Sequence, residues 1–139
     1  MPANPETLLY QRLRDNLPQD CRITRIESRV GLGLPDCWVA IAGQGIALLE
    51  LKVVKRGKKV KLSPHQIAFH VTHGAMRVPC FILFQYHPPK SPTIRGARWL
   101  LYRSEQVMDL VRDGVDLAPC ASWPADAVLW HMLKGELTY

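Results

Sequence analysis

The chain has 139 residues, the length of one ordinary domain, and 47% of them are hydrophobic, which excludes a disordered chain. No apolar run reaches the roughly 18 residues that a membrane helix needs, and residues 1–5 lack the basic and apolar parts of a signal peptide. We therefore expect a single domain over residues 1–139 that stays out of membranes and works in the cytoplasm, in the cytosol or on the nucleoid. The formal net charge of +6 is compatible with a polyanionic partner.

The first predicted element is a helix that begins at Asn4 and Pro5. Asn is a favoured N-cap, Pro is favoured at the first helical position, and the helix must end before Pro18. Leucines spaced four apart give it one apolar face: Leu9, Leu13 and Leu17. Glu6 falls in its first turn, where the helix dipole favours a carboxylate with or without a functional role.

Residues 22–29 predict a strand, and a β-hairpin is predicted after it. Two apolar runs, 37–42 and 46–49, are joined by the Gly-Gln-Gly turn 43–45, which is a typical hairpin signal. With Gln44 at the tip, the register predicts Lys52 opposite Asp36.

The same register predicts Glu50 opposite Trp38 and sets the faces of the hairpin. Side chains alternate along a strand, so Glu50 and Lys52 share a face, and Asp36 joins them from the other strand within the ~7–8 Å diagonal reach of cross-strand neighbours. The opposite face is almost purely apolar and is expected in the core: Cys37, Val39, Ile41, Ala47, Leu49, Leu51 and Val53. The three charged side chains are therefore expected to project together.

This trio has the chemistry of a site for a hard divalent cation. Oxygen ligands favour Mg²⁺, Mn²⁺ or Ca²⁺, and Mg²⁺ uses one or two carboxylates while keeping water ligands. Asp36 and Glu50 fit that requirement, and the backbone carbonyl of Leu51 could add a third oxygen. Lys52 could hold or deprotonate an attacking water, which predicts metal-assisted phosphodiester hydrolysis. The alternative is that these residues are solvated on the outer face of a hairpin.

A second helix is predicted to begin at Ser63 and Pro64 and to end near Ala75. Ser63 and Gln66 have the spacing of a capping box, which is a complete structural reason for Gln66. A helix N-terminus directed at the site would also favour phosphate, so a functional contact of Gln66 stays open.

The remaining elements are predicted from apolar runs and caps. Residues 80–86 predict a strand covered on both faces, and residues 99–102 predict another. Ser104 is expected to cap a helix that ends at Gly114, and a last short helix is expected near 124–134. Three tryptophans are assigned either to the core or to an association surface: Trp99, Trp123 and Trp130.

A basic segment follows the predicted catalytic strand directly. No acidic residue interrupts it, and its basic residues beyond Lys52 are Lys55, Arg56, Lys58, Lys59 and Lys61. Such a run can be a solvated loop, but beside a phosphodiester-cleaving site it is expected to bind the DNA backbone.

Cysteines and histidines give no metal motif. The four cysteines have no zinc-site spacing and are expected to be reduced and partly buried. His70 and His73 are three apart on the predicted helix and are expected along a solvated or DNA-facing edge.

Three short motifs together resemble a known family. They are Gly33-Leu34-Pro35-Asp36, Glu50-Leu51-Lys52 and Leu62-Ser63-Pro64-His65-Gln66. This combination resembles the PD-(D/E)xK nuclease superfamily, and most of all its small VRR-NUC (virus-type replication-repair nuclease) proteins, which are related to archaeal-type Holliday-junction resolvases. The matching motifs lie within roughly residues 6–87. The resemblance implies an α/β fold with a restriction-endonuclease-like core, a central mixed β-sheet flanked by helices in the order αβββαβ.

The resemblance also implies roles for particular residues. The implied catalytic residues are Asp36, Glu50, Lys52, Gln66 and Glu6. The metal ligands would be Asp36, Glu50 and Glu6, with the backbone carbonyl of Leu51. Glu6 matches the glutamate that the family carries on its first helix, and Glu27, just before the Asp36 motif, is a competing candidate.

The sequence therefore predicts a Mg²⁺-dependent DNA endonuclease, with Mn²⁺ able to substitute. The resemblance implies action on branched DNA or Holliday junctions in DNA repair or recombination, by a homodimer. Two alternatives remain open. One is a non-catalytic nucleic-acid-binding subunit, and the other is a sequence-specific, restriction-like nuclease.

Overall fold

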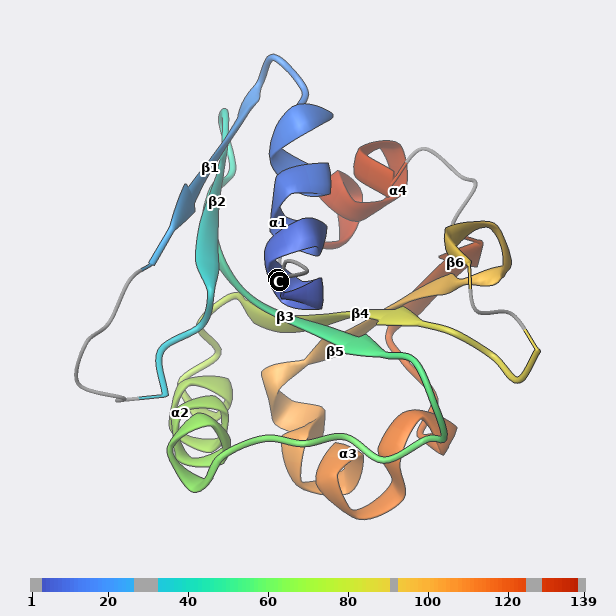
Figure 1. Cartoon of the computed structure of the whole chain (residues 1–139). Helices are drawn as coiled ribbons and strands as arrows, with labels where there is room; N and C mark the ends of the chain where they lie inside the picture. The colour runs from blue at the N-terminus through green and yellow to red at the C-terminus, as the bar shows by residue number, and fades with distance from the viewer. Residues whose placement is uncertain (1–3, 27–32, 91–92, 125–128, 138–139) are drawn as a thin grey trace.

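The computed structural model describes residues 4–26, 33–90, 93–124 and 129–137. In these residues the chain forms a six-stranded mixed sheet with helices on both faces (Figure 1). The order α1-β1-β2-β3-α2-β4 at the front of the chain confirms the predicted αβββαβ arrangement and the α/β class. None of the described helices has the length and apolar character needed to cross a membrane.

The strands lie side by side in sequence order, from β1 to β6. Their bounds are β1 Cys21–Arg25, β2 Cys37–Ile41, β3 Gly45–Val54, β4 Cys80–Tyr86, β5 Arg98–Arg103 and β6 Ala121–Pro124. The helices are α1 Pro5–Asp15, α2 Pro64–Ala75, α3 Val107–Asp113 and α4 Leu129–Glu136, with short 3₁₀ turns η1 Ile94–Gly96, η2 Ser104–Gln106 and η3 Gly114–Asp116. Strands β3 and β4 pair in parallel, whereas the other neighbours are antiparallel. Helix α2 is therefore the crossover between two central strands.

Two apolar layers cover the sheet. Helices α1 and α4 lie on one face, and α2 and α3 lie on the other (Figure 1). Strand β4 contributes to both layers, with Phe81 and Leu83 on the α1 side and Ile82 and Phe84 on the α3 side. The prediction that this continuous apolar strand is covered on both faces is thus confirmed.

Both predicted helix starts are confirmed at the level of individual hydrogen bonds. The Asn4 side chain accepts from the Glu6 amide at 2.8 Å. At α2, the Ser63 hydroxyl accepts from the Gln66 amide at 3.1 Å, while the Gln66 side-chain oxygen accepts from the Ser63 amide at 2.9 Å. The capping box therefore fixes where α2 begins.

Two expectations for the second half of the chain need correction, and a third, in the first half, is described only in part. Ser104 does not cap a helix. It is buried in the turn η2, and α3 begins only at Val107. Pro124 does not begin the last helix, because it ends β6, which pairs with β5; the helix is described as Leu129–Glu136, and residues 125–128 lie outside the described ranges. The predicted strand 22–29 is described only as β1, since residues 27–29 lie outside the described ranges.

Of the two places predicted for the three tryptophans, the structure puts them in the core. Trp99 and Trp123 face each other across β5 and β6, and both are buried. Trp130 is also buried and donates from its indole nitrogen to the Leu13 carbonyl at 2.7 Å. This hydrogen bond ties α4 to α1 on one face of the sheet.

The basic segment is anchored to the α3 side by a close backbone approach. The Val115 amide donates to the Lys58 carbonyl at 2.9 Å. Gly114 has φ +65°, and a Cβ atom there would lie 2.0 Å from the Lys58 carbonyl oxygen. The contact therefore requires glycine for space as well as for conformation.

We predict that Gly114→Ala lowers the free energy of unfolding by about 2 kcal/mol more than Gly57→Ala. Gly57 is the matched control, because its φ is +70° and a Cβ atom there meets nothing within 4 Å. Both substitutions strain the backbone, but only Gly114→Ala forces the basic segment away from η3. Urea denaturation measures the difference, and equal losses would show that the anchor contributes nothing.

Candidate metal site

The hairpin places Asp36 opposite Glu50 rather than opposite Lys52. Cys37 pairs with Leu49 and Ile41 pairs with Gly45, so extending the ladder by one residue sets Asp36 across from Glu50. The predicted register is wrong by two residues.

The error comes from the turn. Residues 42–44 form the loop, and the Gln44 amide donates to the Ile41 carbonyl at 3.0 Å, so the tip lies at Gly43 rather than Gln44. Trp38 consequently pairs with Leu48 and not with Glu50. Because the shift is an even number of residues, it leaves each side chain on its predicted face. The apolar face of the hairpin accordingly packs into the core as expected.

Asp36 is held at the point where β2 begins. Its carboxylate Oδ2 accepts from the Leu51 amide at 2.6 Å, and its backbone carbonyl accepts from the Ile26 amide at 2.8 Å. The carboxylate thus replaces the backbone acceptor that the β2–β3 ladder would otherwise offer beyond its last pair. It binds β3 one residue after Glu50.

The same geometry positions the backbone carbonyl of Leu51. Along a strand, successive residues direct their backbone groups to alternate sides. The Leu48 amide donates toward β4, to Pro79, whereas the Leu51 amide donates toward Asp36. The Leu51 carbonyl therefore also points to the β2 side, beyond the end of the β2–β3 ladder, and lies beside the Asp36 carboxylate.

Glu50 is a buried carboxylate in the centre of the sheet, only 1% exposed. Burial raises its pKa, and the negative charge of Glu6 adds to this, while the hydrogen bond with Asp36 and the charge of Lys52 lower it. Its Oε1 has no hydrogen-bond partner among the described residues. The charge of Lys52 therefore compensates the burial of this carboxylate only in part.

Asp36 shares this shortage of positive charge. Burial, followed by the hydrogen bond and the charge of Glu50, raises the pKa of Asp36 to about 8, although the Leu51 amide and Lys52 act against the rise. A buried and a half-buried carboxyl group side by side cannot both ionise at low cost, so the metal-free pair keeps a proton at neutral pH. A divalent cation would displace that proton, because carboxyl groups bind Mg²⁺ in their ionised form.

A pocket of about 280 Å³ lies at the end of β3, two residues beyond Glu50, and neither Asp36 nor Glu50 lines it. Its lining includes both Glu6 of α1 and Lys52 of β3. No group of three His, Cys, Asp or Glu side chains close enough to hold a metal occurs in the described part of the chain. The direct ligand role of Glu6 therefore stays a prediction, and Glu27 lies outside the described residues.

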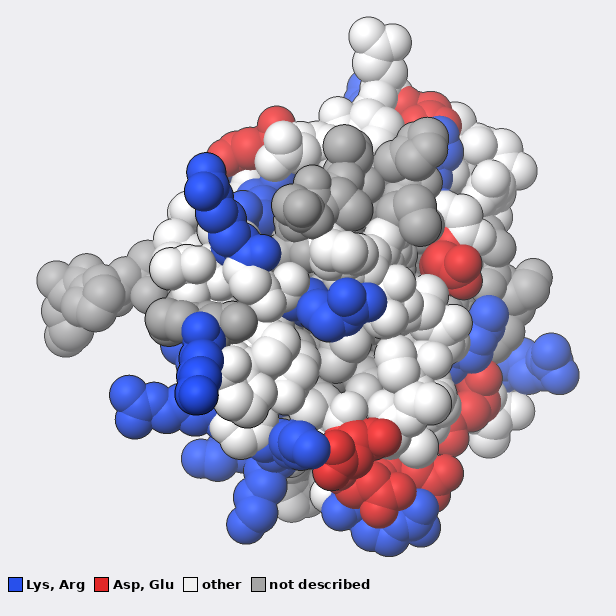
Figure 2. Space-filling view, turned by 90° about the vertical axis from the view of Figure 1, so that its right-hand side faces the viewer, with Lys and Arg blue, Asp and Glu red and all other residues white. Residues whose placement is uncertain are grey.

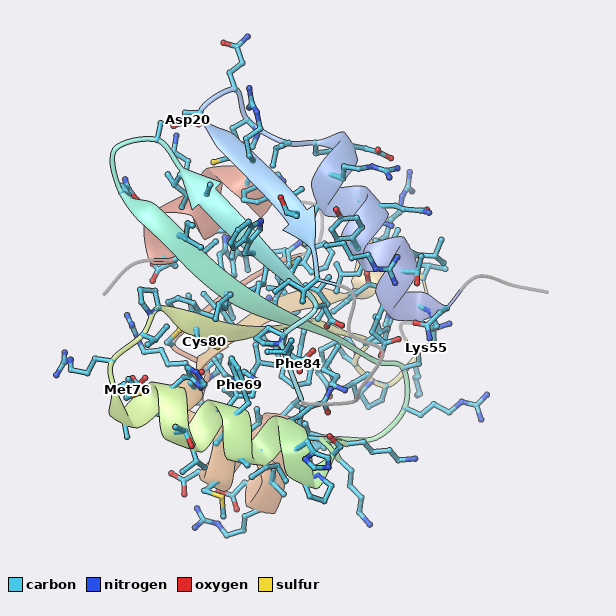
Figure 3. The ribbon with its side chains drawn as sticks, turned by 90° about the vertical axis from the view of Figure 1, so that its left-hand side faces the viewer. Asp20, Lys55, Phe69, Met76, Cys80 and Phe84 are labelled. Carbon is cyan, nitrogen blue, oxygen red and sulfur yellow. The ribbon has the colours of Figure 1, made fainter. Side chains whose placement is uncertain are left out.

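Four of the five basic residues in the basic segment line the same pocket: Lys55, Arg56, Lys59 and Lys61. All four are exposed, and Lys55 lies where β3 ends, near the start of α1 (Figure 3). Lys58 differs, because its ammonium group pairs with Asp116 at 2.8 Å. On the side of the molecule nearest β6, Lys and Arg side chains are mixed with acidic ones (Figure 2).

Gln66 is placed at the start of α2 and is engaged in the capping box. The loop that leads to Asp36 packs against it, since a Cβ atom on Gly33 would lie 2.3 Å from the His65 carbonyl and 2.6 Å from the Gln66 amide. Gly33 has φ +73°, so glycine alone allows this approach. The structure thus brings the first turn of α2 to the segment that carries Asp36, while a catalytic role for Gln66 stays a prediction.

His70 is a residue of this site that sequence reasoning misplaced. It was expected on an edge, but it is fully buried, and its Nε2 lies 3.9 Å from Glu50 Oε1. Burial, followed by the charges of His73 and Lys52, lowers its pKa to about 4, so the contact is not an ion pair at neutral pH. The available signal was helical spacing, because His70 lies one turn after Gln66 on the same helix.

Comparisons with known proteins give a similarity among solved structures but none to a family model. No family model matches the chain, and the search of curated proteins found no match. Among solved structures, the chain is similar to Hjc of Archaeoglobus fulgidus, a Holliday junction resolvase from an archaeal hyperthermophile. The TM-score is 0.48 with 15% sequence identity, over 73% of this chain and 75% of that chain.

We predict that Asp36→Asn flattens the pH dependence of stability in the metal-free protein. An unfolded aspartate releases its proton near pH ~3.9, whereas the folded protein keeps it to about pH 8. The folded state then binds more protons between these values, so the free energy of unfolding falls as pH rises. The lowered pKa of His70 acts in the opposite sense between about pH 4 and its ordinary value of 6.5, which leaves a clean window above pH 6.5.

Denaturation in EDTA between pH 6.5 and pH 8 measures this effect. Wild type should lose up to about 1.4 kcal/mol per pH unit, and Asp36→Asn should lose clearly less and be the more stable protein at pH 8. Asp15→Asn, at an exposed carboxylate, should follow wild type. A slope in Asp36→Asn as steep as in wild type would contradict the assignment of the proton to the Asp36–Glu50 pair.

Proposed function

We propose that the protein is a Mg²⁺-dependent endonuclease that hydrolyses phosphodiester bonds in DNA. The observation that carries the proposal is the pairing of buried Glu50 with half-buried Asp36 near Lys52, a residue that lines a pocket with basic side chains. Burying two carboxyl groups side by side destabilises the folded state unless a cation binds them. The neighbouring basic residues suit a polyanion, because they line the same pocket as Lys52.

Asp36 and Glu50 would hold the metal through their carboxylates, together with the Leu51 carbonyl. These are oxygen donors, as Mg²⁺ requires, and Mn²⁺ can use the same set. When bound, the cation would stabilise negative charge that develops on the phosphate.

Lys52 supplies the positive charge that belongs to the protein itself. It lies two residues after Glu50 on the same face of β3 and lines the pocket. From there it would hold the attacking water and stabilise charge on the phosphate oxygens. Gln66 would help to orient the water, and Glu6 would act on the metal directly or through water.

The preferred substrate in this proposal is branched DNA, including Holliday junctions, and the family is the VRR-NUC type of PD-(D/E)xK nuclease. Support comes from the three motifs around Asp36, Glu50 and Gln66. Symmetric cleavage of a four-way junction needs two sites, so the active form would be a homodimer. The place of action would be the cytosol or nucleoid, in DNA repair or recombination.

A non-catalytic nucleic-acid-binding subunit is the second candidate. The basic segment alone would support it. A pure binder, however, gains nothing from two buried carboxylates beside a phosphate-binding surface, because they repel the ligand. A sequence-specific nuclease remains a third candidate, which a fixed cleavage pattern on plasmid DNA would favour.

We predict that Asp36→Ala, Glu50→Ala and Lys52→Ala each lower cleavage of labelled DNA by at least about 100-fold, because each removes charge stabilisation at the reacting phosphate. The assay compares linear, flap and four-way DNA with Mg²⁺, and EDTA should abolish cleavage by wild type. Lys90→Ala, an exposed residue outside the pocket, is the control. Cleavage by Lys52→Ala at the wild-type rate would refute the assigned chemistry.

We predict unequal contributions to DNA affinity within the basic segment. Lys55→Ala with Lys59→Ala should weaken binding and lower the slope of log affinity against log salt by about 2, one unit per phosphate contact. Lys58→Ala should lower the slope by less than Lys55→Ala or Lys59→Ala alone, because Asp116 already neutralises the Lys58 side chain. Fluorescence anisotropy in EDTA at several salt concentrations measures both, and equal effects at Lys58 and Lys59 would contradict the ion-pair argument.

A further inference from the structure

A chain of buried polar groups connects β4 to Glu50 through α2. It begins at the Cys80 carbonyl, which accepts from the Ser104 hydroxyl at 2.9 Å. Ser104 Oγ lies 2.8 Å from His70 Nδ1. His70 Nε2 then lies 3.9 Å from Glu50 Oε1. All the side chains in this chain are at most 1% exposed, so each interaction takes place out of bulk water.

The first two contacts fix the tautomer of His70. A carbonyl only accepts, so Ser104 must donate its single hydroxyl proton to Cys80. Ser104 can then only accept from His70, and this 2.8 Å contact, shorter than the 3.6 Å contact of Nδ1 with the weakly donating Cys80 thiol, places the ring proton on Nδ1. Nε2 therefore carries a lone pair and no proton in the neutral ring.

The lone pair of Nε2 faces an oxygen that is also an acceptor. Neither His70 Nε2 nor Glu50 Oε1 has a hydrogen-bond partner among the described residues. A separation of 3.9 Å is too long for a direct hydrogen bond but matches a bridging donor placed about 2.8 Å from each atom. One water molecule has two protons and fits both acceptors.

This chain lies in a closely packed part of the fold. Helix α2 approaches η2 closely, since a Cβ atom on Gly74 would lie 3.0 Å from the Glu105 amide and 3.2 Å from Ser104. Cys80 and Glu50 lie on the face of β3 and β4 that α2 covers, as the neighbouring register pairs Leu48–Cys80 and Glu50–Ile82 require. Figure 3 shows Cys80 at the start of β4, directly above α2. The imidazole is therefore enclosed between α2, η2 and the sheet, with its Nε2 on the side of Glu50.

We infer that His70 is a positioning residue for the metal site, which orients the Glu50 carboxylate through one bridging water and is itself oriented by Ser104. This inference rests on the proposed function. If only packing were needed under α2, an apolar side chain would fill the space without leaving buried acceptors unpaired. The polar chain instead fixes the plane of Glu50 by holding one oxygen, so that the other is directed to the Asp36 side.

Two substitutions separate the two nitrogen atoms of His70. His70→Asn keeps a donor at the Nδ1 position for Ser104 but removes the atom at Nε2. His70→Gln keeps a polar atom at the Nε2 position and gives up the bond to Ser104. His73→Asn is the matched control, because His73 lies on the same helix and bonds to the Phe69 carbonyl at 2.8 Å.

The measurement is the affinity of the metal-free protein for Mn²⁺ alone, from the free-ion signal in electron paramagnetic resonance. We expect His70→Asn to weaken binding by about 10- to 100-fold, His70→Gln to stay within a few-fold of wild type, and His73→Asn to match it. Wild-type affinity in His70→Asn would overturn the inference even if its Tm fell. An equal loss in His70→Gln would also overturn it, because the Nε2 position would then not matter.

A measurement on the wild-type protein keeps the inference testable if the variants do not fold. Long-range ¹H–¹⁵N spectra should show His70 with a protonated Nδ1 and an unprotonated Nε2, and the Nε2 resonance should move when Mg²⁺ is added. A proton on Nε2, or no response to Mg²⁺, would overturn the inference. A wild-type protein that binds neither ion would instead refute the proposed function, and this inference with it.

Discussion

The burial of Glu50 next to Asp36 is the constraint on which the rest of the site depends. Glu50 lies in the middle of β3, the strand on which β2 pairs from one side and β4 from the other, so it cannot reach bulk water by a change of rotamer. Asp36 is tied to the following residue through the Leu51 amide. The fold thus holds two acids together against their mutual repulsion, and its apolar layers supply the stability that this arrangement costs.

The two faces of the sheet contribute different residues around this pair. The α1 side brings Glu6 to the pocket wall, and the α2 side brings His70 against the buried oxygen of Glu50. The basic segment leaves the end of β3 and carries positive charge past the same pocket before α2 begins. The basic side chains that would attract a polyanion and the two acids that would bind a cation therefore lie on one continuous stretch of chain, from Asp36 to the end of the basic segment.

Local signals in the sequence predicted the parts of the fold that depend on neighbouring residues. The caps at Asn4 and Ser63 and the apolar face of the hairpin follow from short-range chemistry. The register required the conformation of the turn, which two glycines leave open. Ser104 has a typical capping residue type, but its hydroxyl bonds to a strand far away in sequence. His70 was misplaced because its burial depends on how α2 lies on β3 and β4, which no local pattern contains.

The three-residue loop at 42–44 has a consequence well beyond the tip of the hairpin. An insertion or deletion of two residues there would slide the strands but leave each side chain facing the same layer. An insertion or deletion of one residue would turn one strand over, so that Asp36 would point to the α1 layer, away from Glu50 on β3. Whether the number of residues in this loop changes by an even or an odd number therefore decides whether the two acids stay together. A mutant with a one-residue change could keep its hairpin and still lose every property that requires both acids.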